Sequence, residues 1–155
     1  MAQIMTRFIN LALASLLTGN GVGSLVFVFP ALHALEPAAK AAAEQALTRT
    51  YLPIMRALMP ATLVSCLVRL AQLRNQPAAF GWALLGTAGF AGMLGITLVE
   101  LPINRETLEI APDAPPAYWA ERRQRWEHFN QLRTLSEVVG WCALVQAALN
   151  ERERS

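Results

Sequence analysis

Residues 78–101 read AAFGWALLGTAGFAGMLGITLVEL, and this stretch decides the fold. It carries no charge until Glu100. A membrane-spanning helix needs about 20 predominantly apolar residues, so the segment predicts a transmembrane helix. Glycines at positions 86, 89, 92 and 95 predict a face that a neighbouring helix approaches closely.

Three further apolar stretches accompany it. Residues 8–29 would span about 33 Å as a helix, enough to cross a hydrocarbon core of about 30 Å. They exceed the roughly 7–15 residues of a signal-peptide core, so we expect a retained membrane helix. Residues 51–71 are interrupted by Arg56, Pro60 and Arg69, and residues 132–149 carry Arg133 and Glu137 near their start. The four stretches together predict an all-α, four-helix transmembrane bundle.

The composition is that of a membrane protein with a single domain, residues 1–155. Hydrophobic residues make up 54 % and charged residues 15 %, below the roughly 25 % that is usual in soluble domains. A net charge of +2 without a basic patch argues against a nucleic-acid partner. The abundance of Ala, Leu and Arg beside a single Lys is typical of GC-rich bacteria. We therefore expect a multi-pass protein of the bacterial inner membrane.

The connectors between the spans differ in length. Residues 72–77 predict a short turn, and the Ala-rich residues 30–50 predict a surface helix between the first two spans. Residues 102–131 should begin as irregular chain, because Pro102 is expected to end the third helix, and become a helical extension of the fourth span at 117–131. With four crossings, both long connectors lie on one side of the membrane, and the termini and the short turn lie on the other.

One face of the last predicted helix gathers the polar candidates. At about 100° per residue, a stripe about 80° wide holds Trp119, Trp126, Asn130, Arg133, Glu137 and Trp141. The opposite side holds His128, Leu135, Val139, Cys142 and Gln146. Charged groups within a membrane face protein rather than lipid, so Asn130, Arg133 and Glu137 should point into the bundle. The stripe either lines a polar pocket between helices or contains only an i,i+4 ion pair, in which Arg133 and Glu137 neutralise each other.

The end of the third span supplies a second polar group. Glu100 is expected at the same depth as Arg133, either as an inter-helix ion pair or as part of a site. If Pro102 ends the helix, Asn104 and Arg105 can reach back over the bundle.

The sequence lacks the patterns of common metal and cofactor sites. His33 and His128 have no second histidine at ligand spacing. Cys66 and Cys142 fall within apolar segments, where a free cysteine behaves as a small hydrophobe. GxSxG, P-loop and GxGxxG motifs are also missing. We expect neither a metal nor an organic cofactor.

Three segments together resemble one known family. VFVFPAL (26–32), ELPINRETL (100–108) and YWAERRQRWEHFNQLRTL (118–135) resemble, in order and spacing, the anthrone oxygenase-like integral membrane family, much of which is catalogued as a domain of unknown function. The resemblance covers nearly the whole chain. The positions that match recurrent family residues are Pro30, Pro102, Asn104, Trp126, Asn130, Arg133 and Thr134. Many relatives carry His at the position of Asn130 or Gln131, and this chain does not.

The resemblance implies a function, because members of that family oxidise polyketide anthrones to anthraquinones with molecular oxygen and need no cofactor. The leading hypothesis is therefore an oxygenase for a lipophilic phenol, hydroquinone or anthrone-type substrate. Glu100 or Glu137 would be the base, and Arg133 with Arg105 would stabilise the anion. Asn104 and Asn130 would orient the substrate, and Trp126 would form a wall of the pocket.

A non-catalytic accessory, lipophile-binding or carrier protein is the alternative. In that case the same polar groups only tie the helices together. The expected partners are a lipophilic small molecule and membrane lipid, and a homo-oligomer is compatible with both functions.

Overall fold

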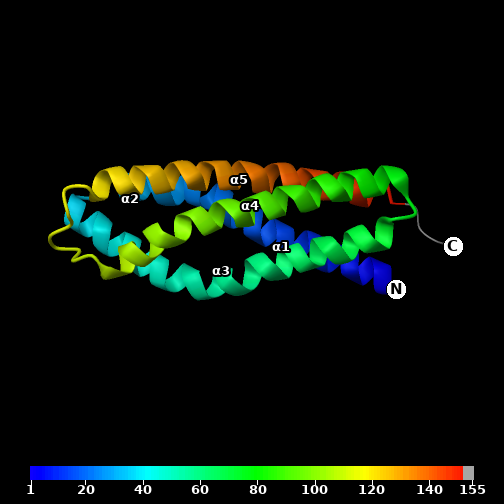
Figure 1. The fold of residues 1–155 in the computed structure, drawn as a ribbon, viewed down its shortest axis with the longest axis horizontal. Helices are drawn as coiled ribbons and strands as arrows, with labels where there is room; N and C mark the ends of the chain where they lie inside the picture. The colour runs from blue at the N-terminus through cyan, green and yellow to red at the C-terminus, as the bar shows by residue number, and fades with distance from the viewer. Residues whose placement is uncertain (152–155) are drawn as a thin grey trace.

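The computed structural model describes residues 1–151, and the regular secondary structure in that range is all helical. The first helix runs through three consecutive segments: α1 (Ala2–Gly23), the π-helical η1 (Ser24–Val28) and α2 (Phe29–His33). The others are α3 (Pro37–Leu73), α4 (Pro77–Glu109) and α5 (Trp119–Leu149). They form the four-helix bundle that the sequence predicts (Figure 1).

The helices alternate in direction along the bundle. The start of α1, the end of α5 and the α3–α4 turn lie at one end, and the α2–α3 and α4–α5 connections lie at the other, as expected (Figure 1). α1 packs beside α3 and α5, and α4 packs beside the same two helices. α3 and α5 are therefore diagonal neighbours across the bundle axis.

Three helices are long and apolar enough to cross a membrane, which is the architecture of a multi-pass membrane protein: Gln3–His33, Pro37–Leu73 and Pro77–Glu109. α5 is less apolar, because its first half is charged and its second half begins with Arg133 and Glu137. The 37 residues of α3 give a helix about 55 Å long, well beyond a hydrocarbon core of about 30 Å. Since its apolar residues lie toward the α3–α4 turn, we expect the opposite end of the bundle to project out of the hydrocarbon.

The segment expected to be a surface helix is helical, but it is continuous with the second span. α3 begins at Pro37, a favourable residue for a first helical turn, and continues to Leu73 through Pro53 and Pro60. The residues between Pro37 and Tyr51 contain neither Gly nor Pro, so the sequence offers no point at which the helix would end.

The prediction that Pro102 ends the third helix is wrong. α4 continues through Pro102 to Glu109, and the irregular chain is confined to residues 110–118. A proline removes one backbone hydrogen bond, but contacts with neighbouring helices can support a membrane helix across that gap. Asn104 and Arg105 therefore lie on a regular helix rather than on a turn.

The glycines of α4 form its closest contact with α5. A Cβ atom on Gly89 would lie 2.7 Å from the Cα of Gly140, and one on Gly86 would lie 2.7 Å from Cδ2 of Leu144. Ser136 donates its hydroxyl to the carbonyl oxygen of Gly89 at 2.8 Å. The close approach predicted from the glycines is confirmed at these positions and at Gly92, whereas Gly95 has no such neighbour within 4 Å.

The face of α5 follows the helical projection. Asn130, Arg133 and Glu137 are buried, and His128 is exposed, as predicted. The remaining residues of the predicted outer face are exposed as well: Leu135, Val139, Cys142 and Gln146.

Candidate functional site

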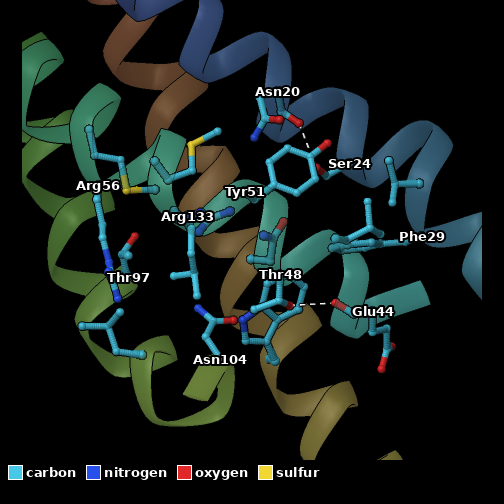
Figure 2. A pocket seen from close by; sticks show the side chains of 18 of the residues that line it. Asn20, Ser24, Phe29, Glu44, Thr48, Tyr51, Arg56, Thr97, Asn104 and Arg133 are labelled. Atoms are coloured by element: carbon cyan, nitrogen blue, oxygen red, sulfur yellow. Dashed lines mark hydrogen bonds between the residues drawn. The ribbon is translucent and has the colours of Figure 1, made fainter. Parts of the chain in front are cut away.

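A cavity of about 290 Å³ lies between the four helices, in the half of the bundle that ends at the long connectors. This volume is near the lower end of the roughly 300–1,000 Å³ of small-molecule sites. Figure 2 shows side chains from all four helices converging on it. Its apolar walls include Val28, Phe29, Leu32, Leu47, Leu52, Met55, Met59, Leu94 and Leu101. Its polar lining is Asn20, Ser24, Glu44, Thr48, Tyr51, Arg56, Thr97, Asn104, Arg123, Asn130 and Arg133.

The π-helical segment forms the wall that the first helix contributes. In η1 the backbone N–H of Phe29 bonds to the carbonyl oxygen of Ser24, five residues back. Pro30 has no N–H, so the carbonyl four residues before it lacks the usual partner and the wider turn is tolerated. Ser24 and Val28, at the two ends of this turn, both line the cavity, and the Ser24 hydroxyl donates to the carbonyl oxygen of Asn20 at 2.9 Å.

Arg133 links α5 to α4 at the inner part of the cavity. Its Nη1 donates to Oε2 of Glu100 at 2.8 Å, and its Nε lies 3.7 Å from Oε1 of Glu137. Both carboxyl groups are almost fully buried. Gly21 of α1 leaves room for the Glu137 side chain. A Cβ atom at this position would lie 2.5 Å from Oε2 of Glu137 and 3.0 Å from Oγ1 of Thr134. One guanidinium therefore serves two buried carboxyl groups from adjacent helices.

A second buried ion pair closes the outer part of the cavity. Arg123 Nε lies 3.1 Å from Oε1 of Glu44, and Trp119 donates its indole N–H to Oε2 of Glu44 at 3.3 Å. The Arg123 guanidinium also lies over the ring of Trp126, 4.2 Å from its centre. Burial lowers the pKa of Arg123 from its usual value, and the negative charge of Glu44 opposes that shift. This pair joins α3 to the first half of α5.

Nine buried side-chain atoms in the described chain have no hydrogen-bond partner in the protein, and all lie in this region. They belong to Glu44, Glu100, Arg123, Trp126, Asn130, Arg133, Thr134 and Glu137. Buried polar groups are normally paired. Five of these residues also line the cavity, so a polar group of a ligand could pair with atoms of its wall: Glu44, Arg123, Trp126, Asn130 and Arg133.

The residues predicted from the sequence divide into three sets. Asn104, Trp126, Asn130 and Arg133 line the cavity. Glu100 and Glu137 lie behind Arg133 and are not part of the wall. Arg105 is exposed and does not line the cavity, because the uninterrupted helix through Pro102 turns it to a different face from Asn104.

Sequence reasoning missed three charged residues of the wall: Glu44, Arg56 and Arg123. Arg123 follows Trp119 by four residues and precedes Trp126 by three, so the same projection places it on the polar stripe. Arg56 was visible as a charge within a span. Glu44 had no such signal, because its segment was expected to lie apart from the second span.

Other reactive side chains lie apart from the cavity. His33 is exposed and its Nε2 lies 3.0 Å from Glu127. Cys66 is buried and Cys142 is exposed, and both are free thiols. Within residues 1–151, no group of three or more His, Cys, Asp or Glu is arranged to hold a metal ion.

Comparisons of the chain with protein-family models, curated proteins and solved structures found no match.

Proposed function

We propose that this protein is a membrane-embedded oxygenase of the bacterial inner membrane that oxidises a lipophilic phenol, hydroquinone or anthrone-type compound with molecular oxygen. The observation that carries the proposal is the cavity, which combines apolar walls with a few guanidinium and amide groups. A lipophilic substrate can enter such a site from the bilayer while its hydroxyl group meets polar side chains. The motif resemblance supplies the class of reaction.

The chemistry needs a base and a stabilised anion. Removing a proton from a phenol or from the methylene of an anthrone leaves an electron-rich anion that can transfer an electron to O₂. In the anthrone case the methylene becomes a carbonyl, one oxygen atom enters the product, and the second leaves as water with the two hydrogens. In this proposal Arg133, Asn104 and Asn130, which line the cavity, stabilise and orient the anion.

The base that best fits the geometry is Glu44. Among residues 1–151, Glu44 carries the only carboxyl group that lines the cavity. Glu100 and Glu137 lie behind Arg133. We therefore assign the proton-accepting role to Glu44 and give Glu100 and Glu137 the role of positioning the Arg133 guanidinium.

Oxygen uptake tests this proposal. Purified protein in nanodiscs is mixed with a panel of quinols, alkylphenols and anthrones, and wild type is compared with Glu44→Gln. We expect Glu44→Gln to lose most of its activity, while Glu121→Gln, which changes an exposed carboxyl group on α5, keeps it. The lack of uptake by wild type with every compound would refute the oxygenase. Equal uptake by wild type and Glu44→Gln would refute the assigned base.

A non-catalytic binding or carrier protein is the second candidate. The observation that favours it is the placement of Glu100 and Glu137, which tie α4 and α5 to Arg133 rather than facing the cavity. Saturable binding of a lipophilic phenol without oxygen uptake would decide for this function.

A further inference from the structure

Three arginines within residues 1–151 line the cavity, and Arg56 is the one that has no carboxylate partner. Arg123 pairs with Glu44, and Arg133 pairs with Glu100. No ion pair or hydrogen bond within residues 1–151 involves Arg56. Among the charged side chains that line the cavity, Arg56 is therefore the one without an oppositely charged partner in the protein.

The surroundings of Arg56 are apolar. It lies within the second span, and its neighbours on the cavity side of α3 are Leu52, Met59 and Pro60. Figure 2 shows its side chain extending beside Thr97 of α4. Because Arg56 lines the cavity and is also exposed, it stands at the opening toward the outside of the bundle. An arginine within an apolar membrane segment is costly and normally has a partner.

Arg56 at the opening and Arg133 deeper inside approach the cavity from different helices. Arg56 belongs to α3 and Arg133 to α5, the helix diagonally opposite, and both border the same cavity. Asn104 and Thr97 also line the cavity, and they belong to α4, the helix that packs beside both α3 and α5. Apolar side chains cover the rest of the cavity, so the site has a charged part and a hydrophobic part.

We propose that the cavity binds its ligand as an anion, a carboxylate or phenolate on an apolar body, and that Arg56 supplies the binding charge opposite Arg133. This inference deepens the proposed function and depends on it only for the cavity being the ligand site. The phosphate of an anionic membrane lipid has the same charge and could occupy the same place, so the test must separate the two sources.

The experiment measures binding rather than turnover. Wild-type protein in nanodiscs of phosphatidylcholine is titrated with the fluorescent cis-parinaric acid and with its uncharged methyl ester. We expect saturable binding of the acid, and binding of the ester that is about ten to a hundred times weaker, as follows from the loss of a hydrogen bond to a charged group. In Arg56→Gln the affinity for the acid should fall to that for the ester. In Arg56→Lys most of the preference should remain.

Arg105→Gln is the matched control, because Arg105 is exposed and lies outside the cavity. It removes the same charge from the chain and should leave both affinities unchanged. Nanodiscs that also contain phosphatidylglycerol identify the source of the anion. Acid binding that is unaffected by this lipid indicates a free amphiphile, whereas competition by it indicates a lipid headgroup, and both results retain the anion site.

Two results would overturn the inference. One is equal binding of acid and ester by wild type. The other is an unchanged acid preference in Arg56→Gln, whatever its melting temperature, since Arg56 would then not supply the binding charge. Normal acid binding without oxygen uptake would refute the proposed oxygenase and leave the anion site intact.

Discussion

Arg133 donates a 2.8 Å hydrogen bond from Nη1 to Oε2 of Glu100, a carboxyl group with no exposed surface. The pair connects α5 to α4 next to the cavity. Because Glu137 is also buried beside the same guanidinium, loss of the Arg133 charge would leave two carboxyl groups without a cation. The predictions below begin with this pair.

Arg133→Ala should lower the free energy of unfolding strongly, by an amount that can reach about 3–5 kcal/mol for a buried pair. Arg133→Lys should retain much of this stability, because the charge remains, but it loses the planar fork that holds two groups at once. If the site is catalytic, Arg133→Lys folds and loses most oxygen uptake. Melting temperature in detergent and oxygen uptake are measured together for wild type, both variants and Glu100→Gln. Unchanged uptake in Arg133→Lys and Glu100→Gln would refute the anion-stabilising role that the proposed function gives to Arg133.

Gly89→Ala should force α4 and α5 apart. The added Cβ would meet the backbone of Gly140 at 2.7 Å, and backbone atoms cannot move aside as a flexible side chain can. Overpacking of this kind costs about 1–3 kcal/mol. Gly95→Ala is the control, because a Cβ at Gly95 has no neighbour within 4 Å. Thermal unfolding in detergent should separate the two variants, and equal melting temperatures would contradict the close contact.

Gly21→Ala should act on the site more than on stability. The added Cβ would lie 2.5 Å from Oε2 of Glu137, the mobile end of a side chain, so the carboxyl group has to move away from α1. We expect a small change in melting temperature together with a clear change in ligand affinity, because Arg133 loses part of its support. Gly19→Ala, with open space at its Cβ, should change neither property.

The Arg123–Glu44 pair should show strong energetic coupling. Both side chains are about 95 % buried or more, so a double-mutant cycle with Glu44→Gln and Arg123→Gln should give an interaction energy within about 0.5–3 kcal/mol, toward the upper end. The Arg122–Glu106 pair has a similar distance of 3.0 Å but much greater exposure. Its coupling should stay below about 1 kcal/mol. Chemical denaturation in detergent measures both cycles, and equal couplings would contradict the role of burial.

The sequence was most informative where one physical rule acts alone. Hydropathy located the apolar segments, and the 100° projection identified Asn130, Arg133 and Glu137 as buried and His128 as exposed. The prediction from sequence failed at Pro102, where contacts between helices outweigh the tendency of a proline to end a helix. Local signals do not report such contacts.

The candidate site was predictable only in part. Four of the seven predicted residues line the cavity. Trp126, Asn130 and Arg133 do so because they share one face of α5, whereas Asn104 reaches the cavity from the regular helix α4 and not from the predicted turn. Glu44 could not be found in this way, since its meeting with Arg123 depends on α3 running straight from the connector into the second span. The same continuity brings Arg56 and Glu44 to one cavity wall.

The limited apolarity of α5 has a consequence for biogenesis. α4 is apolar enough to partition into the bilayer by itself, whereas α5 carries Arg133 and Glu137 into the bundle. Glu100 of α4 neutralises the charge of Arg133. The glycines of α4 let the backbone of α5 approach closely. As α5 follows α4 from the ribosome, we expect its integration to depend on a preceding helix that is already in place, so that the two helices enter the membrane as a cooperative unit.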